Sequence, residues 1–276
     1  MQSLDVDPAT LDHTDSLRRT TEVQLTLLIA GLVTARALIE DHRLDVGIVA
    51  GHSIGAFAAA VTAGVLTVQE AVEVVYRRGQ SMQKTVQDGR WGMAAVTGLS
   101  LRSTSKLAET SSTESDPLWV ANVNAVDEIV VSGTMTALRR LRDQAGRAGA
   151  RDVKLLDVAV ASHCPLQRRT AAELADRLAC VPRRRQEIAY ITNTGGRRVV
   201  ADAERVIDDL AQSVARPVRW HDGVGLMSEL GVRTAIETPP GHVLTHLVTR
   251  TAPEIRALSI DDAGLSETLT RARKQR

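Results

Sequence analysis

The run VGIVAGHSIGAFAAA (residues 46–60) places a serine between two glycines, directly after a short apolar segment. The apolar residues before Gly51 predict a buried β-strand, and the small apolar residues after Gly55 predict a helix. A G-x-S-x-G turn between a strand and a helix holds its serine at a sharp elbow, beside the free N–H groups of the helix start. Ser53 is therefore a candidate nucleophile, although a glycine-rich turn with an ordinary serine also fits these five residues.

The composition limits the classes of protein to consider. The 276 residues suffice for one large domain or two smaller ones, and 43% of them are hydrophobic, with only 2% aromatic. The 34 basic and 33 acidic residues give a net charge of +1, so we expect neither a nucleic-acid surface nor a membrane surface. Two cysteines are too few for a disulfide framework. We recognise no signal peptide and no continuous apolar run of about 18 residues, and we expect a cytoplasmic protein.

The segments around the elbow alternate between helix and strand. We expect a helix over 22–39, a strand over 45–50 and a helix over 54–63. Thr67 and Glu70 form a T-x-x-E capping box, which predicts the start of another helix. Alternation of this kind predicts an α/β fold built on a parallel sheet.

From residue 92 the order of elements changes to β-α-β-β-α-β, which is the ferredoxin-like unit. Its expected strands are 93–99, 118–125, 128–133 and 152–160, and its expected helices are 102–110 and 136–149. We interpret residues 92–161 as a small domain inserted into a large domain made of residues 1–91 and 162–276. In the second part of the large domain we expect helices at 165–179, 202–214, 218–230, 242–250 and 262–273, and strands at 188–193 and 233–238.

A serine nucleophile needs a base, which is usually histidine. His163 follows the last strand of the inserted unit, in the kind of loop where a scaffold places catalytic groups. His242 and His246 are alternatives near the C-terminus, one helical turn apart. Their spacing also suits a metal, but no third ligand at suitable spacing accompanies them, so we expect no metal site.

Arg78 lies on the apolar stripe of the helix that starts at Val68, three residues after Val75. Its neighbour Arg77 lies on the flank, where Glu73 can pair with it. An arginine on a buried face needs an anion, because an unpaired buried charge is unfavourable. The anion can be a substrate carboxylate, or the charge can be satisfied by distant protein groups, and the pattern alone leaves both open.

Several motifs together resemble one family along nearly the whole chain. They are GHSIG (51–55), RRGQSMQ (77–83), GMAAVTGL (92–99), VANVNA (120–125), IVVSG (129–133), VASHCPL (160–166), PVRW (217–220) and ETPPGHVLT (237–245). Their order and spacing are similar to those of the malonyl/acyl-CoA to acyl-carrier-protein transacylases. That resemblance implies a hydrolase-like α/β large domain with a ferredoxin-like insert, in agreement with the pattern described above.

The resemblance also implies roles for particular residues. Ser53 corresponds to the acylated nucleophile, His163 to its base, and Arg78 to the clamp on the malonyl carboxylate. The backbone N–H of Ile54 would form half of the oxyanion hole, and a carbonyl of Gln212 or, one residue later, Ser213 would orient the histidine. No bound cofactor is implied: malonyl-CoA is the donor, and the prosthetic thiol of an acyl carrier protein is the acceptor.

Within the family, residues 208–222 and 238–245 look most like the epsilon (malonyl-transferase) subunit of malonate decarboxylase. That resemblance implies a dedicated carrier protein and further malonate decarboxylase subunits as partners. The alternative is a stand-alone malonyltransferase of fatty-acid or polyketide synthesis. Against that alternative, Ala56 stands where this branch often has an acidic residue.

The family opens with a strand and a G-Q-G-x-Q loop that supplies a second oxyanion N–H, and this sequence contains no such motif. By family spacing we expect a chain that begins late. The strand at 45–50 should then lack one neighbour and the oxyanion one donor.

Two further hypotheses compete with a transferase. A serine hydrolase would use His242 or His246 as its base, in the order serine, acid, histidine. A non-catalytic subunit would dock on the carrier protein without reacting. The inserted unit and Arg78 argue against the hydrolase, whereas the missing N-terminal motif keeps the docking subunit open.

Overall fold

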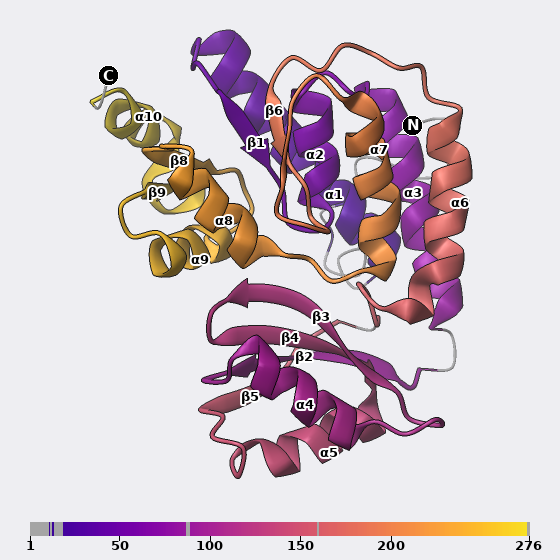
Figure 1. The fold of residues 1–276 in the computed structure, drawn as a ribbon. Coiled ribbons are helices and arrows are strands. Elements are labelled where there is room, and N and C mark those ends of the chain that lie inside the picture. The colour runs from indigo at the N-terminus through magenta and orange to yellow at the C-terminus, as the bar shows by residue number, and fades with distance from the viewer. Residues whose placement is uncertain (1–10, 12, 14–18, 87–88, 159, 275–276) are drawn as a thin grey trace.

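The computed structural model of this chain describes residues 11, 13, 19–86, 89–158 and 160–274. Most of the polar N-terminal segment, and residue 159 of the strand expected at 152–160, lie outside that set. Figure 1 shows a group of helices around β1 and β6, a separate four-stranded sheet, and a C-terminal group of short helices and strands. The expected α/β class, with a large and a small domain, is confirmed.

The nucleophile candidate follows β1 (Ile48–Ala50), a short strand at one end of a three-stranded sheet. β1 pairs in parallel with β6 (Ala189–Ile191), and β6 pairs antiparallel with β7 (Arg198–Val199). Within the described part of the chain β1 has no other partner strand. Because parallel strands end at the same edge, residues after Ala50 and after Ile191 are brought together there.

Five helices pack against one face of these strands and share one apolar core. They are α1 (Thr20–Arg36), α2 (Gly55–Thr62), α3 (Val68–Thr85), α6 (Arg168–Ala179) and α7 (Ala203–Gln212). Ile48, Ala50 and Ile191 belong instead to a second core, together with residues of the C-terminal group. The capping box at the start of α3 is confirmed: Thr67 accepts from the N–H of Glu70, and Glu70 accepts from the N–H of Thr67. This cap fixes where α3 begins, and therefore which of its residues face the core.

The first helix continues through a π-helical segment, Ala37–Asp41. Residues Thr20–Asp41 together are long and apolar enough to cross a membrane by length and composition, with a mean hydropathy of 1.6. This result differs from our expectation that no such segment exists. Leu25, Leu28 and Leu32 of this helix are buried in the core shared with α2 and α3, so we interpret it as a core helix.

The small sheet has the strand order β3-β4-β2-β5, with every neighbouring pair antiparallel. Its strands are β2 (Trp91–Thr97), β3 (Leu118–Ala125), β4 (Glu128–Thr134) and β5 (Asp152–Leu155), and α4 (Leu101–Ser111) and α5 (Met135–Ala145) cover one face (Figure 1). The order agrees with the β-α-β-β-α-β unit predicted from sequence. β5 is shorter than expected and ends at Leu155.

The C-terminal group contains α8 (Trp220–Glu229), β8 (Thr234–Glu237), α9 (Val243–Thr251), β9 (Arg256–Ser259) and α10 (Ile260–Arg273). β8 and β9 form a two-stranded parallel sheet. The sequence pattern did not predict β7 or β9, because each is short and gains its strand character from a partner. The bond from Val123 N–H to Val218 O joins the segment just before α8 to β3.

Candidate active site

The elbow places Ser53 in a strained backbone conformation. Its φ is +53°, in the left-handed region that costs a residue with a Cβ about 1 kcal/mol or more. The turn requires a glycine at position 51, because a Cβ there would lie 2.1 Å from the carbonyl carbon and oxygen of Gly55. The G-x-S-x-G pattern is thus explained at Gly51 by a close backbone approach.

Ser53 and His163 meet although they are separated by 110 residues. The Nε2 of His163 lies 2.8 Å from the Oγ of Ser53, and its Nδ1 lies 2.6 Å from the carbonyl oxygen of Ser213. A carbonyl can only accept, so Nδ1 carries the proton and Nε2 is free to accept from the serine hydroxyl. The arrangement suits general-base activation of a serine, with a backbone carbonyl in the orienting role.

Of the two carbonyls expected to orient the histidine, that of Ser213 accepts the bond from His163, and that of Gln212, one residue earlier, does not. Gln212 ends α7, and the chain then tightens into a 3-10 turn, Ser213–Ala215. The last carbonyls of a helix lack intrahelical partners, so Ser213 O is available to an outside donor. The bond from His163 N–H to Val214 O, 2.7 Å long, holds the same turn against the histidine.

The His163 side chain is buried, with only 2% of the residue exposed. Burial, followed by the positive charge of Arg78, lowers its pKa to about 3. The imidazole is therefore neutral at physiological pH, as a base must be before it takes a proton. His163 also has a positive φ of +58°, so the loop that carries it is held in place by its surroundings.

Arg78 points into the same space as the nucleophile. Its Nη2 donates to Ser53 Oγ across 3.2 Å, and its Nη1 donates to the side-chain oxygen of Gln24. Only 2% of Arg78 is exposed, and burial lowers its pKa to about 10, which leaves it charged at neutral pH. Among the described residues no carboxylate pairs with Arg78, and its Nε has no hydrogen-bond partner.

Gln24 is a site residue that the sequence analysis missed. It lies on α1, 54 residues before Arg78, and is 6% exposed. The two helices come close because Gly79 has no side chain: a Cβ there would lie 2.5 Å from the Cα of Thr21. The sequence offered one signal for this residue, a glutamine among the apolar residues of the 22–39 helix. That signal does not indicate that the glutamine contacts Arg78.

Ile54 is the N-cap residue of α2, with φ −60° and ψ −32°. Backbone N–H groups at the start of a helix have no intrahelical acceptor and carry the positive end of the helix dipole. The N–H of Ile54 directly follows Ser53. In a G-x-S-x-G elbow this N–H donates to the oxyanion that forms on the carbonyl oxygen of the acyl group when the serine attacks it.

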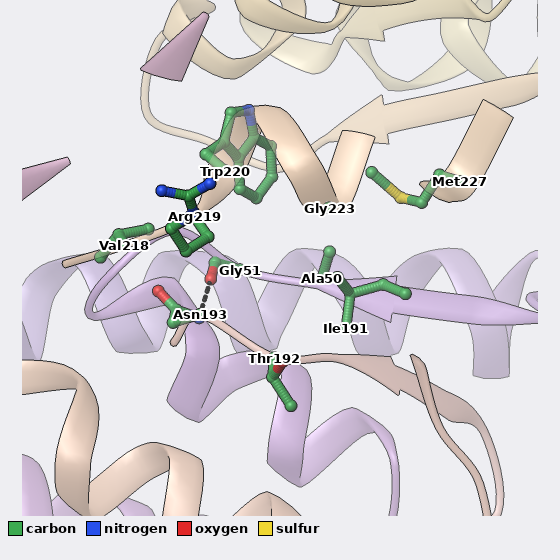
Figure 2. A pocket seen from close by; sticks show the side chains of 10 residues that line it. All are labelled: Ala50, Gly51, Ile191, Thr192, Asn193, Val218, Arg219, Trp220, Gly223 and Met227. Carbon is green, nitrogen blue, oxygen red and sulfur yellow. Dashed lines mark hydrogen bonds between the residues drawn. The ribbon is translucent and has the colours of Figure 1, made fainter. Parts of the chain in front are cut away.

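The end of β6 contributes Asn193, which the sequence analysis also missed. Its side chain bonds to the elbow at Ser53 N–H and Gly51 O, and the second bond is drawn in Figure 2. The hollow in that view measures about 10 Å³, which is the room of roughly one water, so it is not the substrate site. A larger hollow of about 450 Å³, between α3 and α6, has none of Ser53, Arg78 and His163 in its lining.

The alternative base candidates are engaged elsewhere. His242 lies 2.8 Å from Asp262 and is half exposed, and its ring lies against that of His246. Within the described ranges no group of three or more His, Cys, Asp or Glu is arranged to hold a metal ion.

Comparisons with known proteins agree on one family. The sequence pattern described as "Acyl transferase domain" matches residues 7–275. The malonyl CoA-acyl carrier protein transacylase of Salmonella typhimurium is 32% identical over 257 residues, covering 93% of this chain and 82% of the relative. The structure of such a transacylase from Coxiella burnetii is 30% identical, with a TM-score of 0.87, over 97% of this chain and 84% of that one. A malonyl-transacylase solved with its type II PKS acyl-carrier protein is 28% identical, with a TM-score of 0.91, over 100% and 88%.

Proposed function

The chain belongs to the acyl transferase domain family, and from this premise we propose that it moves a malonyl group from malonyl-CoA to the thiol of an acyl carrier protein. The observation that carries the proposal is the convergence of a serine, a neutral histidine and a buried arginine that pairs with no carboxylate of the described residues. Each of the three supplies one requirement of the reaction. Ser53 holds the acyl group, His163 moves the proton, and Arg78 binds the malonyl carboxylate.

In the first half-reaction, Nε2 of His163 takes the Ser53 proton while Oγ attacks the thioester carbonyl of malonyl-CoA. The negative charge on the carbonyl oxygen of the tetrahedral intermediate is stabilised by the N–H of Ile54 and the start of α2. The C–S bond then breaks, and the leaving thiolate of CoA takes the proton from His163. The product is malonyl esterified to Ser53.

In the second half-reaction, the carrier thiol replaces CoA. His163 takes the thiol proton, and the sulfur attacks the ester carbonyl of malonyl-Ser53. The C–O bond breaks, and Ser53 recovers its proton from His163. The Nδ1–H of His163, held by Ser213 O, keeps the ring in the correct tautomer through both halves.

The preference for a malonyl group rests on Arg78. A buried guanidinium without a carboxylate partner favours a ligand that supplies one, and a carboxylate can accept two parallel N–H bonds from it. An acetyl group leaves that charge uncompensated. The same anion would offset the positive charge beside His163 and so increase the basicity of the imidazole when the correct substrate is bound.

The sequence analysis favoured the epsilon subunit of malonate decarboxylase, with that enzyme's other subunits as partners. The relatives reported above carry transacylase names, and another relative, from Burkholderia thailandensis, is named a polyketide biosynthesis protein. These names support the alternative, a stand-alone malonyltransferase that serves fatty-acid or polyketide synthesis.

Intact-protein mass spectrometry after addition of malonyl-CoA tests the proposal. We expect a stable malonyl ester on Ser53 that disappears when a holo carrier protein is added. Release of free malonate without an adduct would indicate a hydrolase, and no reaction would indicate a docking subunit. Comparing a carrier with a phosphopantetheine arm and one with a phosphoribosyl-dephospho-CoA arm separates the stand-alone enzyme from the malonate decarboxylase subunit.

A further inference from the structure

We propose, resting on the function proposed above, that Asn193 is a positioning residue that sets the rate at which Ser53 is acylated. Its side-chain oxygen accepts from the N–H of Ser53 at 2.8 Å, and its side-chain nitrogen donates to the carbonyl oxygen of Gly51 at 2.7 Å. One carboxamide therefore clamps both sides of the His52–Ser53 turn. Figure 2 shows Asn193 directly beneath the Gly51 carbonyl.

The two bonds require an amide side chain. Ser53 N–H is a donor and Gly51 O is an acceptor, so the group between them must both accept and donate. Aspartate has the same shape but, when ionised, can only accept. The position of Asn193 explains how its side chain reaches the elbow. Ile191 is in register with Ala50 on the neighbouring parallel strand, so Asn193, two residues after Ile191, lies beside the residues that follow Ala50.

The clamp is itself rigidly held. Asn193 is 4% exposed, its N–H donates to Asp209, and its carbonyl accepts from the N–H of Arg219. Asp209 is also 4% exposed and accepts three further bonds, from the hydroxyl of Tyr190 and from the N–H and hydroxyl of Thr194. Asp209 thus ties the end of β6 to α7.

The consequence concerns geometry at the nucleophile. Ser53 keeps an unfavourable left-handed φ only because its surroundings hold it there. Asn193 is part of those surroundings, because its side-chain oxygen accepts from the N–H of Ser53. That φ directs Oγ toward Nε2 of His163 and turns the next N–H, that of Ile54, toward the reacting carbonyl. Loosening the clamp should misplace both groups together, and a displacement of about 1 Å can lower a rate by about 10².

The test uses the full chain with Asn193→Leu, which removes both bonds, and Asn193→Asp, which removes the donation to Gly51 O. The matched control is Gln186→Leu. Gln186 is a buried carboxamide just before β6 that donates to Ile188 O and Val199 O, accepts from the N–H of Asp202, and makes no hydrogen bond to the elbow.

Single-turnover acylation by saturating malonyl-CoA, followed by quenched mass spectrometry, gives a rate constant and an amplitude for each protein. We expect both Asn193 variants to reach full amplitude among folded molecules, with a rate constant lowered by about 10-fold to 100-fold. Gln186→Leu should lower the melting temperature and leave the rate constant unchanged.

The outcomes separate the two proposals. If wild type forms no malonyl-Ser53, the proposed function fails before Asn193 is tested. If wild type is acylated and the Asn193 variants show the wild-type rate constant with only a smaller amplitude, Asn193 is a structural residue and the inference is wrong.

Discussion

Arg78 donates from Nη2 to the Oγ of Ser53 across 3.2 Å, so a buried cation and a candidate nucleophile face the same space. A serine that only needed activation would require His163 alone. Arg78 pairs with no carboxylate in the described part of the chain, and a buried charge without such a partner is unfavourable by several kcal/mol. The arrangement becomes favourable when an acyl group carrying a carboxylate occupies the site.

Replacing the nucleophile should stop acyl transfer and leave the fold intact. Ser53→Ala removes the hydroxyl but keeps a small side chain at the elbow, where space is limited by the approach of Gly51 to Gly55. We expect no covalent loading from malonyl-CoA and a near-native circular dichroism spectrum. A malonyl adduct on another residue of this variant would disprove the assignment.

Removing the base should lower the acylation rate by several orders of magnitude, because the serine hydroxyl is then not deprotonated. His163→Gln is the test, since glutamine roughly preserves the buried volume. The control is His242→Ala, which breaks an exposed contact with Asp262 and should leave the rate unchanged. A large loss of rate in His242→Ala with a small loss in His163→Gln would instead favour a serine hydrolase that uses His242 as its base.

The lowered pKa of His163 should also appear in the stability of the protein. Between the ordinary value of 6.5 and the folded-state pKa of about 3, the unfolded chain binds a proton that the folded chain does not. The free energy of unfolding therefore carries no penalty from His163 above about pH 6.5, and this residue makes it fall as the pH drops toward 3. Urea unfolding at several pH values should show a shallower fall for His163→Gln than for wild type. His52, whose pKa is also lowered by burial, is present in both proteins and cancels in the comparison.

Arg78→Ala should change specificity as well as rate. Without the guanidinium, the malonyl carboxylate loses its partner, so kcat/KM for malonyl-CoA should fall by about 10²-fold or more, while acetyl-CoA is affected much less. Arg77→Ala is the matched control, because Arg77 is the adjacent arginine and pairs with Glu73 on the exposed flank of α3. Equal losses with both acyl donors would show that Arg78 has a structural role only.

Some features of this site could be predicted because they depend only on residues that are close together in the sequence. The capping box of Thr67 and Glu70 fixes the start of α3, and the apolar stripe that follows identifies Arg78 as a buried arginine. The G-x-S-x-G turn likewise identifies Ser53 from five consecutive residues.

Other features depend on contacts between distant segments. Gln24 meets Arg78 only because α1 and α3 pack closely at Gly79, and Asn193 meets the elbow only because β6 lies beside β1. The choice between Gln212 and Ser213 depends on a change from α-helix to 3-10 turn, and helix ends are weakly determined by local sequence. β9 likewise gains its strand character from pairing with β8.

The hydrogen bond between Gln24 and Arg78 offers a charge-based test of whether Arg78 binds the malonyl carboxylate. Gln24→Glu preserves the shape of the side chain and supplies Arg78 with a carboxylate, which none of the described residues provides. We expect the new ion pair to compete with the malonyl carboxylate, so that the KM for malonyl-CoA rises by about 10-fold or more. The relative use of acetyl-CoA should not fall, because an acetyl group makes no demand on the guanidinium. Gln24→Leu is the comparison: it frees Arg78 without neutralising it and should affect KM less. If Gln24→Glu leaves the KM for malonyl-CoA unchanged, the malonyl carboxylate does not bind at Arg78.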